Sequence, residues 1–405
     1  MSLTNQDVGS VELPSQNDAI AIAISPALLS TSAWMTALGL SLAPAVTTGI
    51  ARFSYGLILP AMRQDLSWTY TEAGWINTAN AIGYLMGSLL ALMFVAKLGP
   101  RRLFAGGMIV TTLALLASGL TRDFWFLSLW RVLAGLGGAP AFIAGGAMVS
   151  TLFRGDPSRN SMAIAVYGGG GGFGTLLTAL LIPSMLTNGG NDAWPVAWLL
   201  LAVLSALATI PAVFAAHVIP LSIESRGGET PGAVSIGPML PALIGYFLFS
   251  IGYIVYITFL SSWMRTQGAG TALTVATWAV LGLAVMLSPM PWRRLLARVQ
   301  GGEALALACL ATGVGTLLPL VVPGPAGLLL SAATFGGSFF IAPTAITAFG
   351  RKNLPEASWA RSVALFTCVF AVGQTLGPVM AGGLADATES LAPGLVAARQ
   401  VALRN

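Results

Sequence analysis

Residues 73–102 read AGWINTANAIGYLMGSLLALMFVAKLGPRR, a long apolar run that ends in a short basic loop. About 20 apolar residues suffice for a helix to cross ~30 Å of hydrocarbon. The same alternation recurs along the chain, in which 56% of the 405 residues are apolar and only 8% are charged. A water-soluble protein would have roughly a quarter of its residues charged. The chain is therefore predicted to be a polytopic membrane protein.

Apolar stretches of about 17–25 residues predict eleven membrane-spanning helices. The runs lack the period-two alternation of a barrel strand, so we interpret them as helices. The predicted spans are 38–62, 73–96, 103–121, 124–151, 161–186, 194–216, 239–264, 272–291, 303–322, 326–349 and 361–385. The segment 391–403 is too short to span and contains Pro393 and Arg399. A twelfth helix is therefore predicted to be short or missing.

Basic residues are distributed unequally between the connections. If the amino terminus is cytoplasmic, the odd-numbered connections hold only Arg63, Arg122 and Arg265. The even-numbered connections hold Lys97, Arg101, Arg102, Arg154, Arg159, Arg226, Arg293, Arg294, Arg298, Arg351, Lys352 and Arg361. Because Lys and Arg accumulate in cytoplasmic loops, this distribution predicts a cytoplasmic amino terminus. The formal charge of +5 reflects this topology, and we expect no nucleic-acid partner.

The longest connection divides the chain into two halves. We predict an amino-terminal tail (1–37), a first helical bundle (38–217), a cytoplasmic linker (218–238) and a second bundle (239–405). Matching features recur at offsets of 199–202 residues: Met62-Arg63 and Met264-Arg265, Gly83 and Gly282, Gly137-Gly138 and Gly336-Gly337, and Ser161 and Ser362. Such a repeat predicts an all-α membrane protein of two pseudo-symmetric six-helix bundles, with its binding site at their interface.

Two arginines are predicted to lie inside the spans, where a charge costs about 2.5–3.5 kcal/mol. Counting 1.5 Å per residue places Arg52 roughly 15 Å and Arg131 roughly 12 Å below the outer surface. Every Asp and Glu falls in a tail, a loop or a helix end, so no mid-membrane carboxylate is expected to pair with either arginine. Because guanidinium forks suit carboxylates, we predict an anionic substrate with Arg52 as main ligand and Arg131 as second ligand or gate. The alternative for Arg131 is helix packing through backbone carbonyls.

Other polar side chains are placed to complete a pocket. Asn77, Asn80 and Tyr84 are spaced to share one helix face. The further candidates are Tyr55, Tyr167, Tyr253, Tyr256 and Gln374. Tyr253 and Tyr256 are expected to form an aromatic wall opposite Arg52. The alternatives are that the asparagines only bond to a neighbouring helix and that the tyrosines belong to an interfacial belt.

No motif indicates a cofactor, a metal site or an enzyme. The glycine run 168–172 lacks the Lys-Ser/Thr of a phosphate-binding loop and favours close helix packing. Cys309 and Cys368 lie in apolar runs without metal-ligand spacing. The spans contain neither a His-Glu-x-x-His nor a Gly-x-Ser-x-Gly sequence.

The chain resembles the major facilitator superfamily in the basic loop Lys97-Leu-Gly-Pro-Arg-Arg102 and in Arg131-Val-Leu-Ala-Gly-Leu-Gly-Gly138. The stretch Gly49-Ile-Ala-Arg-Phe-Ser-Tyr-Gly-Leu-Ile-Leu-Pro-Ala-Met-Arg-Gln-Asp65 is similar, more narrowly, to the bacterial YbfB/YjiJ branch. The resemblance implies alternating access in the bacterial cytoplasmic (inner) membrane. We assign gating to Arg101, Arg102, Gly137, Gly377 and Pro378. The superfamily loop usually opens with Asp, where this chain has Ala96, so a charge relay in the loop is not expected.

These observations predict a secondary transporter for a small organic anion, with a proton or counter-ion as coupling partner. Without an internal carboxylate, the proton is expected to travel on the substrate itself. An exporter of amphipathic compounds, which would use the aromatic walls, is the alternative within this class. A membrane receptor or sensor that does not transport is the alternative from another class. The protein is expected to act as a monomer in the lipid bilayer.

Overall fold

The computed structural model describes residues 26–153, 155–219 and 236–388. Within these residues, eleven helices are long and apolar enough to cross a membrane. They coincide with the eleven spans predicted from the sequence, so this prediction is confirmed. The predicted absence of a complete twelfth helix concerns residues 391–403, which lie outside the described residues.

The described residues form helices and short connections, without a strand. In chain order the elements are α2 (Pro26–Pro44), η1 (Ala45–Phe53), α3 (Ser54–Asp65), α4 (Tyr70–Ser118), α5 (Phe124–Val149), α6 (Pro157–Gly189), η2 (Asn191–Ala193), α7 (Trp194–Val218), η3 (Gly237–Met239), α8 (Leu240–Thr266), α9 (Thr271–Leu287), α10 (Pro289–Arg298), α11 (Glu303–Val321), α12 (Gly324–Phe339), α13 (Ile341–Asn353) and α14 (Glu356–Thr388). The first helix begins at Pro26, before the predicted start of the bundle at residue 38.

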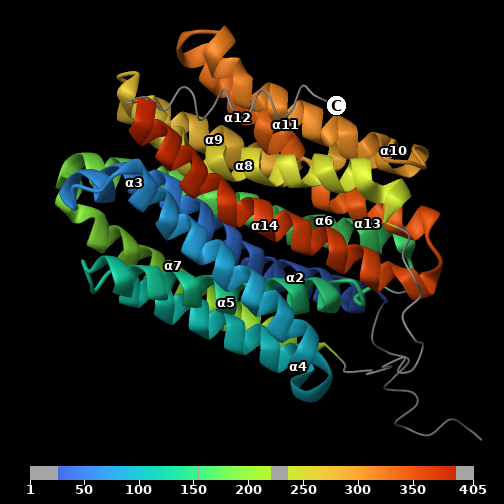
Figure 1. Cartoon of the computed structure of the whole chain (residues 1–405). Helices are drawn as coiled ribbons and strands as arrows, with labels where there is room; N and C mark the ends of the chain where they lie inside the picture. Colours follow the sequence, from blue (N-terminus) through green and yellow to red (C-terminus); the bar gives the residue numbers. More distant parts are fainter. Residues whose placement is uncertain (1–25, 154, 220–235, 389–405) are drawn as a thin grey trace, which may run out of the picture.

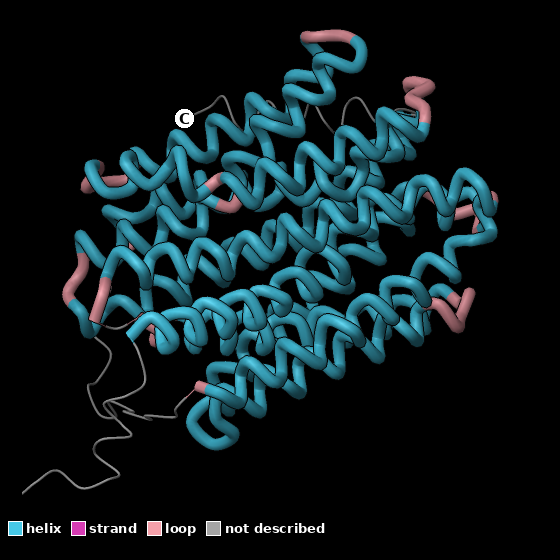
Figure 2. Tube along the Cα trace, turned by 180° about the vertical axis from the view of Figure 1, so that it is seen from behind, coloured by secondary structure: helices cyan, strands magenta, loops and turns pink. Residues whose placement is uncertain are grey.

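The helices run roughly alongside one another, with their connections gathered at two ends (Figure 2). We call the end where α7 stops and α8 starts the linker end, and the end where α3 stops and α4 starts the far end. Elements α2 to α7 form the amino half and α8 to α14 the carboxyl half (Figure 1). The halves meet where α3 contacts α8, α4 contacts α14 and α6 contacts α9.

Helix starts and turns follow local sequence signals. Thr69 and Glu72 form a capping box at the start of α4, in which each side chain accepts from the other residue's backbone N–H. Asp123 and Asp156 accept backbone N–H groups at the starts of α5 and α6. Within α4, the chain reverses at Gly99, whose φ of 76° is unfavourable for other residues, and Pro100 begins the returning helix.

The glycine run of α6 lets this helix pack against both halves. A Cβ atom at Gly170 would lie 1.9 Å from the carbonyl oxygen of Ser41 in α2. A Cβ atom at Gly172 would lie 2.4 Å from the carbonyl oxygen of Gly282 in α9. Since neither position has room for a side chain, the run is a helix-packing surface, as the sequence indicated.

Candidate functional site

The first span changes its winding before it reaches the far end. Residues Ala45–Phe53 form a π-helix, η1, and the backbone N–H of Ser54 donates to Gly49 O, five residues earlier. Gly49 packs directly on α6, because a Cβ there would lie 2.6 Å from Gly174 Cα. Arg52 occupies the last turn of η1, about 20 Å from the end of α3 at 1.5 Å per residue. Short π segments occur often at functional sites, so η1 draws attention to Arg52.

Arg52 crosses the interface between the halves. Its Nη2 donates a hydrogen bond to Gln374 Oε1 in α14, and Tyr253 OH in α8 donates to the same oxygen at 2.5 Å. On the amino side, the guanidinium carbon lies 5.4 Å from the ring centroid of Tyr84 in α4, a cation–π distance. Arg52 is 7% exposed, and its Nε has no hydrogen-bond partner within the described part of the chain. Four predicted ligands, Arg52, Tyr84, Tyr253 and Gln374, are therefore brought together.

An aromatic wall adjoins this group and consists of Phe249, Tyr253, Phe339 and Phe370. The Tyr253 ring stacks on the other three rings with centroid distances of 5.4–5.8 Å. Phe53, the neighbour of Arg52, reaches the wall with its ring 5.7 Å from that of Phe339. The sequence indicated Tyr253 but not the phenylalanines, because Phe in an apolar span gives no signal that separates a site from the core.

Arg52 contacts neutral groups, whereas the ion pairs of Arg122 and Arg159 lie elsewhere. Arg122 Nη1 is 2.8 Å from Asp65 Oδ2 at the far end. Arg159 Nε is 3.3 Å from Asp156 Oδ2 at the start of α6, at the linker end. Arg52 is contacted by the Gln374 amide, which supplies a dipole, and by the Tyr84 ring, which supplies its face. Neither side chain carries a negative charge.

Arg131 is directed into the amino half instead. Its Nη1 donates to Ala51 O at 2.6 Å, and the guanidinium carbon lies 5.4 Å from the Tyr55 ring centroid and 5.1 Å from that of Trp198. The residue is 1% exposed, and the residues that the structure describes offer no hydrogen-bond partner to its Nε and Nη2. These contacts match the alternative in which Arg131 packs helices through a backbone carbonyl. Its role as a second ligand stays a prediction without a contact that joins it to Arg52.

The other predicted ligands have separate surroundings. Four of them bond within a single half: Tyr55 OH to Ala73 O at 2.6 Å, Asn80 Nδ2 to Arg131 O at 3.1 Å, Tyr167 OH to Phe142 O at 2.6 Å, and Tyr256 OH with Ser331 Oγ at 2.7 Å. Asn77 instead crosses the interface, where its Nδ2 donates to Thr258 Oγ1 at 2.5 Å. Asn77, Asn80 and Tyr84 thus face different neighbours despite their helical spacing.

The halves are bonded to each other from the level of Arg52 to the far end. Thr78 Oγ1 donates to Thr375 O at 2.7 Å. At the far end, the Asp386 carboxylate accepts the backbone N–H groups of Tyr70 and Thr71 at 2.8 and 2.9 Å and the Thr71 hydroxyl at 2.6 Å. The far end is therefore closed in this structure.

The predicted gating residues fall into three settings. Arg101 donates to Ile219 O, which joins the basic loop to the end of α7, and Arg102 is exposed. Gly137 and Gly377 are packing positions inside their own halves, against Gly107 in α4 and Ile254 in α8. Pro378 lies at the interface, because its carbonyl oxygen would be 2.3 Å from a Cβ atom at Gly74.

Two helical halves with a buried polar group at their interface define a membrane transporter of the major facilitator type. The chain belongs to the family described as uncharacterised MFS-type transporter YbfB, whose model matches residues 44–403. The predicted family is therefore confirmed.

The curated relatives that the chain matches are named for different functions. The chain is 33% identical to puromycin resistance protein pur8 of Streptomyces alboniger, over 34% of this chain and 27% of that protein. It is 25% identical to nitrate/nitrite transporter NrtP of Nostoc punctiforme, over 40% of this chain and 32% of that protein. It is 24% identical to uncharacterized MFS-type transporter YceJ of Bacillus subtilis, over 84% of this chain and 87% of that protein. The first two relatives are thus matched over about a third of their lengths or less.

A solved structure shows the same fold. The crystal structure of nucleoside transporter NupG superposes with a TM-score of 0.70 over 91% of this chain and 97% of that chain. The sequence identity is 12%, so this likeness concerns the fold alone.

Proposed function

We propose that this transporter carries a small organic anion across the bacterial cytoplasmic membrane by alternating access, with Arg52 as the main ligand. This proposal rests on Arg52, which is buried between the halves and donates to a neutral oxygen, Gln374 Oε1. A buried guanidinium group binds a carboxylate more strongly than an amide oxygen, since both partners are charged and the fork can be bidentate. Nε, which has no partner, supplies a further donor.

Substrate binding at Arg52 would act directly on the contact between the halves. An anion that replaces Gln374 as the acceptor would exchange a bond between the halves for a bond to the substrate. Tyr253 donates to the same Gln374 oxygen, so its hydrogen bond would also be affected when Arg52 leaves that oxygen. A ligand shifts a conformational equilibrium by its difference in affinity for the two states, and this exchange provides such a difference.

The orientation in the membrane and the route of a coupled proton complete the proposal. The linker end, which carries the basic loop with Arg101 and Arg102, is assigned to the cytoplasm by the positive-inside rule. No carboxylate contacts Arg52 in the described part of the chain, so we assign any coupled proton to the substrate rather than to a side chain at this site. We propose that a single chain forms one complete pathway between its halves.

The test is to compare binding and transport in matched arginine variants. Purified protein is first screened by thermal shift against small carboxylates, amino acids and cations, because a ligand of the folded state raises its melting temperature. A carboxylate is expected to stabilise the unmodified protein and an Arg159→Gln control, which removes an exposed arginine at the linker end. It should bind at least tenfold more weakly to Arg52→Gln. Equal binding and uptake by Arg52→Gln would exclude Arg52 as the anion ligand.

The second candidate function is export of amphipathic compounds. The aromatic wall of Phe249, Tyr253, Phe339 and Phe370 favours it, since stacked rings offer a large apolar contact area. The partial likeness to a puromycin resistance protein points in the same direction. Transport that follows substrate hydrophobicity and persists in Arg52→Gln would support the exporter. Ligand binding without flux in proteoliposomes would instead indicate a receptor.

A further inference from the structure

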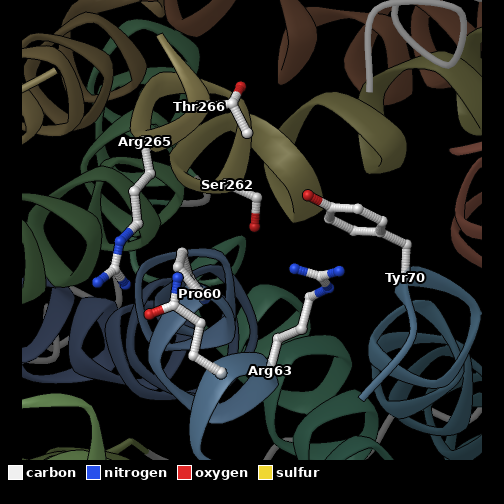
Figure 3. Close-up of a pocket in the computed structure, with 7 residues that line it drawn as sticks. Pro60, Arg63, Tyr70, Ser262, Arg265 and Thr266 are labelled. Carbon is white, nitrogen blue, oxygen red and sulfur yellow. The ribbon is translucent and has the colours of Figure 1, made fainter. Parts of the chain in front are cut away.

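A pocket lined by two arginines lies at the far end of the interface, away from Arg52. It has a volume of about 200 Å³ and is lined by residues that include Arg63, Tyr70, Ser262 and Arg265 (Figure 3). Arg63 and Tyr70 belong to the amino half, whereas Ser262 and Arg265 belong to the carboxyl half. The pocket therefore exists only while the two halves meet at this end.

The charge of the pocket is positive. Arg63 and Arg265 each follow the methionine near the end of the first span of their half, so the repeat brings two equivalent arginines to one place. None of the pocket-lining residues is Asp or Glu. The neighbouring Asp386 carboxylate interacts electrostatically with Arg63, but it is already bonded to the starting residues of α4. Asp65 is paired with Arg122.

Two of the residues that line the pocket have a buried polar atom without a hydrogen-bond partner among the described residues: Arg63 Nε and Ser262 Oγ. The Arg63 guanidinium group points toward the Ser262 hydroxyl across the pocket (Figure 3). The guanidinium group lies over the Tyr70 ring, whose centroid is 3.7 Å from the guanidinium carbon. A buried donor without an acceptor costs about 1–3 kcal/mol, so the pocket favours an occupant with acceptor oxygens.

Arg265 is held at the edge of the pocket by uncharged groups. Its Nη1 and Nη2 both lie 3.2 Å from Asn191 Oδ1, and Asn191 Nδ2 donates to Gln64 Oε1 at 2.7 Å. This network positions Arg265 without neutralising it. An anion in the pocket would therefore be attracted by two cations, one from each half.

We propose that this pocket binds a small oxyanion, of the size of sulfate, phosphate or a short carboxylate, and that the bound anion joins the two halves at the far end. The anion would accept hydrogen bonds from Arg63 Nε and Ser262 Oγ. Since the pocket requires both halves, an occupant stabilises the conformation closed at the far end and opposes its opening. This site is independent of the one assigned to Arg52.

The test uses purified full-length protein and inorganic sulfate as the probe. Melting temperature is measured against sodium sulfate, with sodium chloride at equal ionic strength as reference. Sulfate also stabilises proteins non-specifically, so binding at the pocket is identified by the difference between variants. A saturable stabilisation is expected in the unmodified protein, in Arg52→Gln and in Arg159→Gln, which removes an exposed arginine at the linker end, away from the pocket. In Arg63→Gln and in the milder Ser262→Ala, half-saturation should need at least tenfold more sulfate.

A distance measurement provides the second readout. Spin labels at the exposed positions Leu120 and Val321, at the far ends of the amino and carboxyl halves, report opening. Sulfate should narrow their distance distribution in the unmodified protein and leave it unchanged in Ser262→Ala. An equal sulfate response in all variants, or one lost only in Arg52→Gln, would overturn the proposal.

Discussion

Arg52 and Gln374 meet across the two halves of the protein, where Nη2 of the arginine donates to Oε1 of the glutamine. The two residues are 322 positions apart in the sequence, and Tyr253 donates to the same oxygen. One amide oxygen therefore accepts from an arginine of the amino half and a tyrosine of its own half. This arrangement makes Gln374 the residue whose replacement tests the site most directly.

Replacing Gln374 by Glu should block binding of the anion without unfolding the protein. The new carboxylate would pair with Arg52 and compete with the substrate, and we expect carboxylate affinity to fall at least tenfold, or about 1.4 kcal/mol. Gln374→Leu should act differently, because it leaves two buried donors without an acceptor and lowers stability by about 1–3 kcal/mol. Thermal unfolding and carboxylate binding measured on both variants check this. Undiminished carboxylate binding by Gln374→Glu contradicts the assignment.

Replacing Arg131 by Met should mainly lower stability. The change removes a charged hydrogen bond to Ala51 O, for which about 1.5–3 kcal/mol is typical, and two cation–π contacts. We expect a lower melting temperature, in contrast to Arg52→Gln, which should lose binding but remain stable. Arg131→Lys should restore only part of the loss, since an ammonium group lacks the planar fork. Normal stability with lost carboxylate binding would instead make Arg131 a ligand.

Replacing Asp386 by Ala should loosen the far end. Asp386 accepts the first N–H groups of α4, which have no partner inside the helix, so it acts as a helix cap supplied by the opposite half. A lost cap costs about 0.5–2 kcal/mol. Spin-label distances between Leu120 and Val321 should broaden. Asp123→Ala, which removes a cap inside the amino half, is the control and should leave these distances unchanged.

Replacing Gly74 by Ala should prevent closure at the far end. Its Cβ would lie 2.3 Å from Pro378 O in the opposite half, a contact that backbone atoms cannot accommodate in the closed conformation. Gly106→Ala on the same helix α4 is the control, since nothing lies within 4 Å of its added methyl group. Gly74→Ala should fold but lose uptake, whereas Gly106→Ala should retain it. Equal uptake by the two variants would show that this contact is not part of the transport cycle.

The sequence predicted the spans because hydrophobic length in a membrane depends on local composition alone. The turn at Gly99 was equally readable, from a basic loop with Gly and Pro between two apolar runs. The sequence predicted that Arg52, Tyr84, Tyr253 and Gln374 belong to one site, but not their contacts. The prediction was possible because polar residues in an apolar span are few and tend to face the interior.

The remaining site features depend on neighbours that the sequence does not reveal. Asn77 and Asn80 lie on one helix face, yet one bonds to Thr258 of the opposite half and the other to the Arg131 carbonyl. The π-helix η1 was missed because its winding depends on packing, with Gly49 against α6 and the Ala51 carbonyl bonded to Arg131. The Asp386 cap was missed because its carboxylate lies near a helix end, where the sequence indicates only solvation.

The winding of η1 determines the direction of Arg52 relative to α2. In a π-helix each backbone amide pairs one residue further back than in an α-helix, so each turn contains more residues. A residue of an α-helix turns by about 100° around the axis. A change from one pairing to the other would therefore rotate Arg52 relative to α2. The side of the first span that carries Arg52 thus depends on the winding of these nine residues.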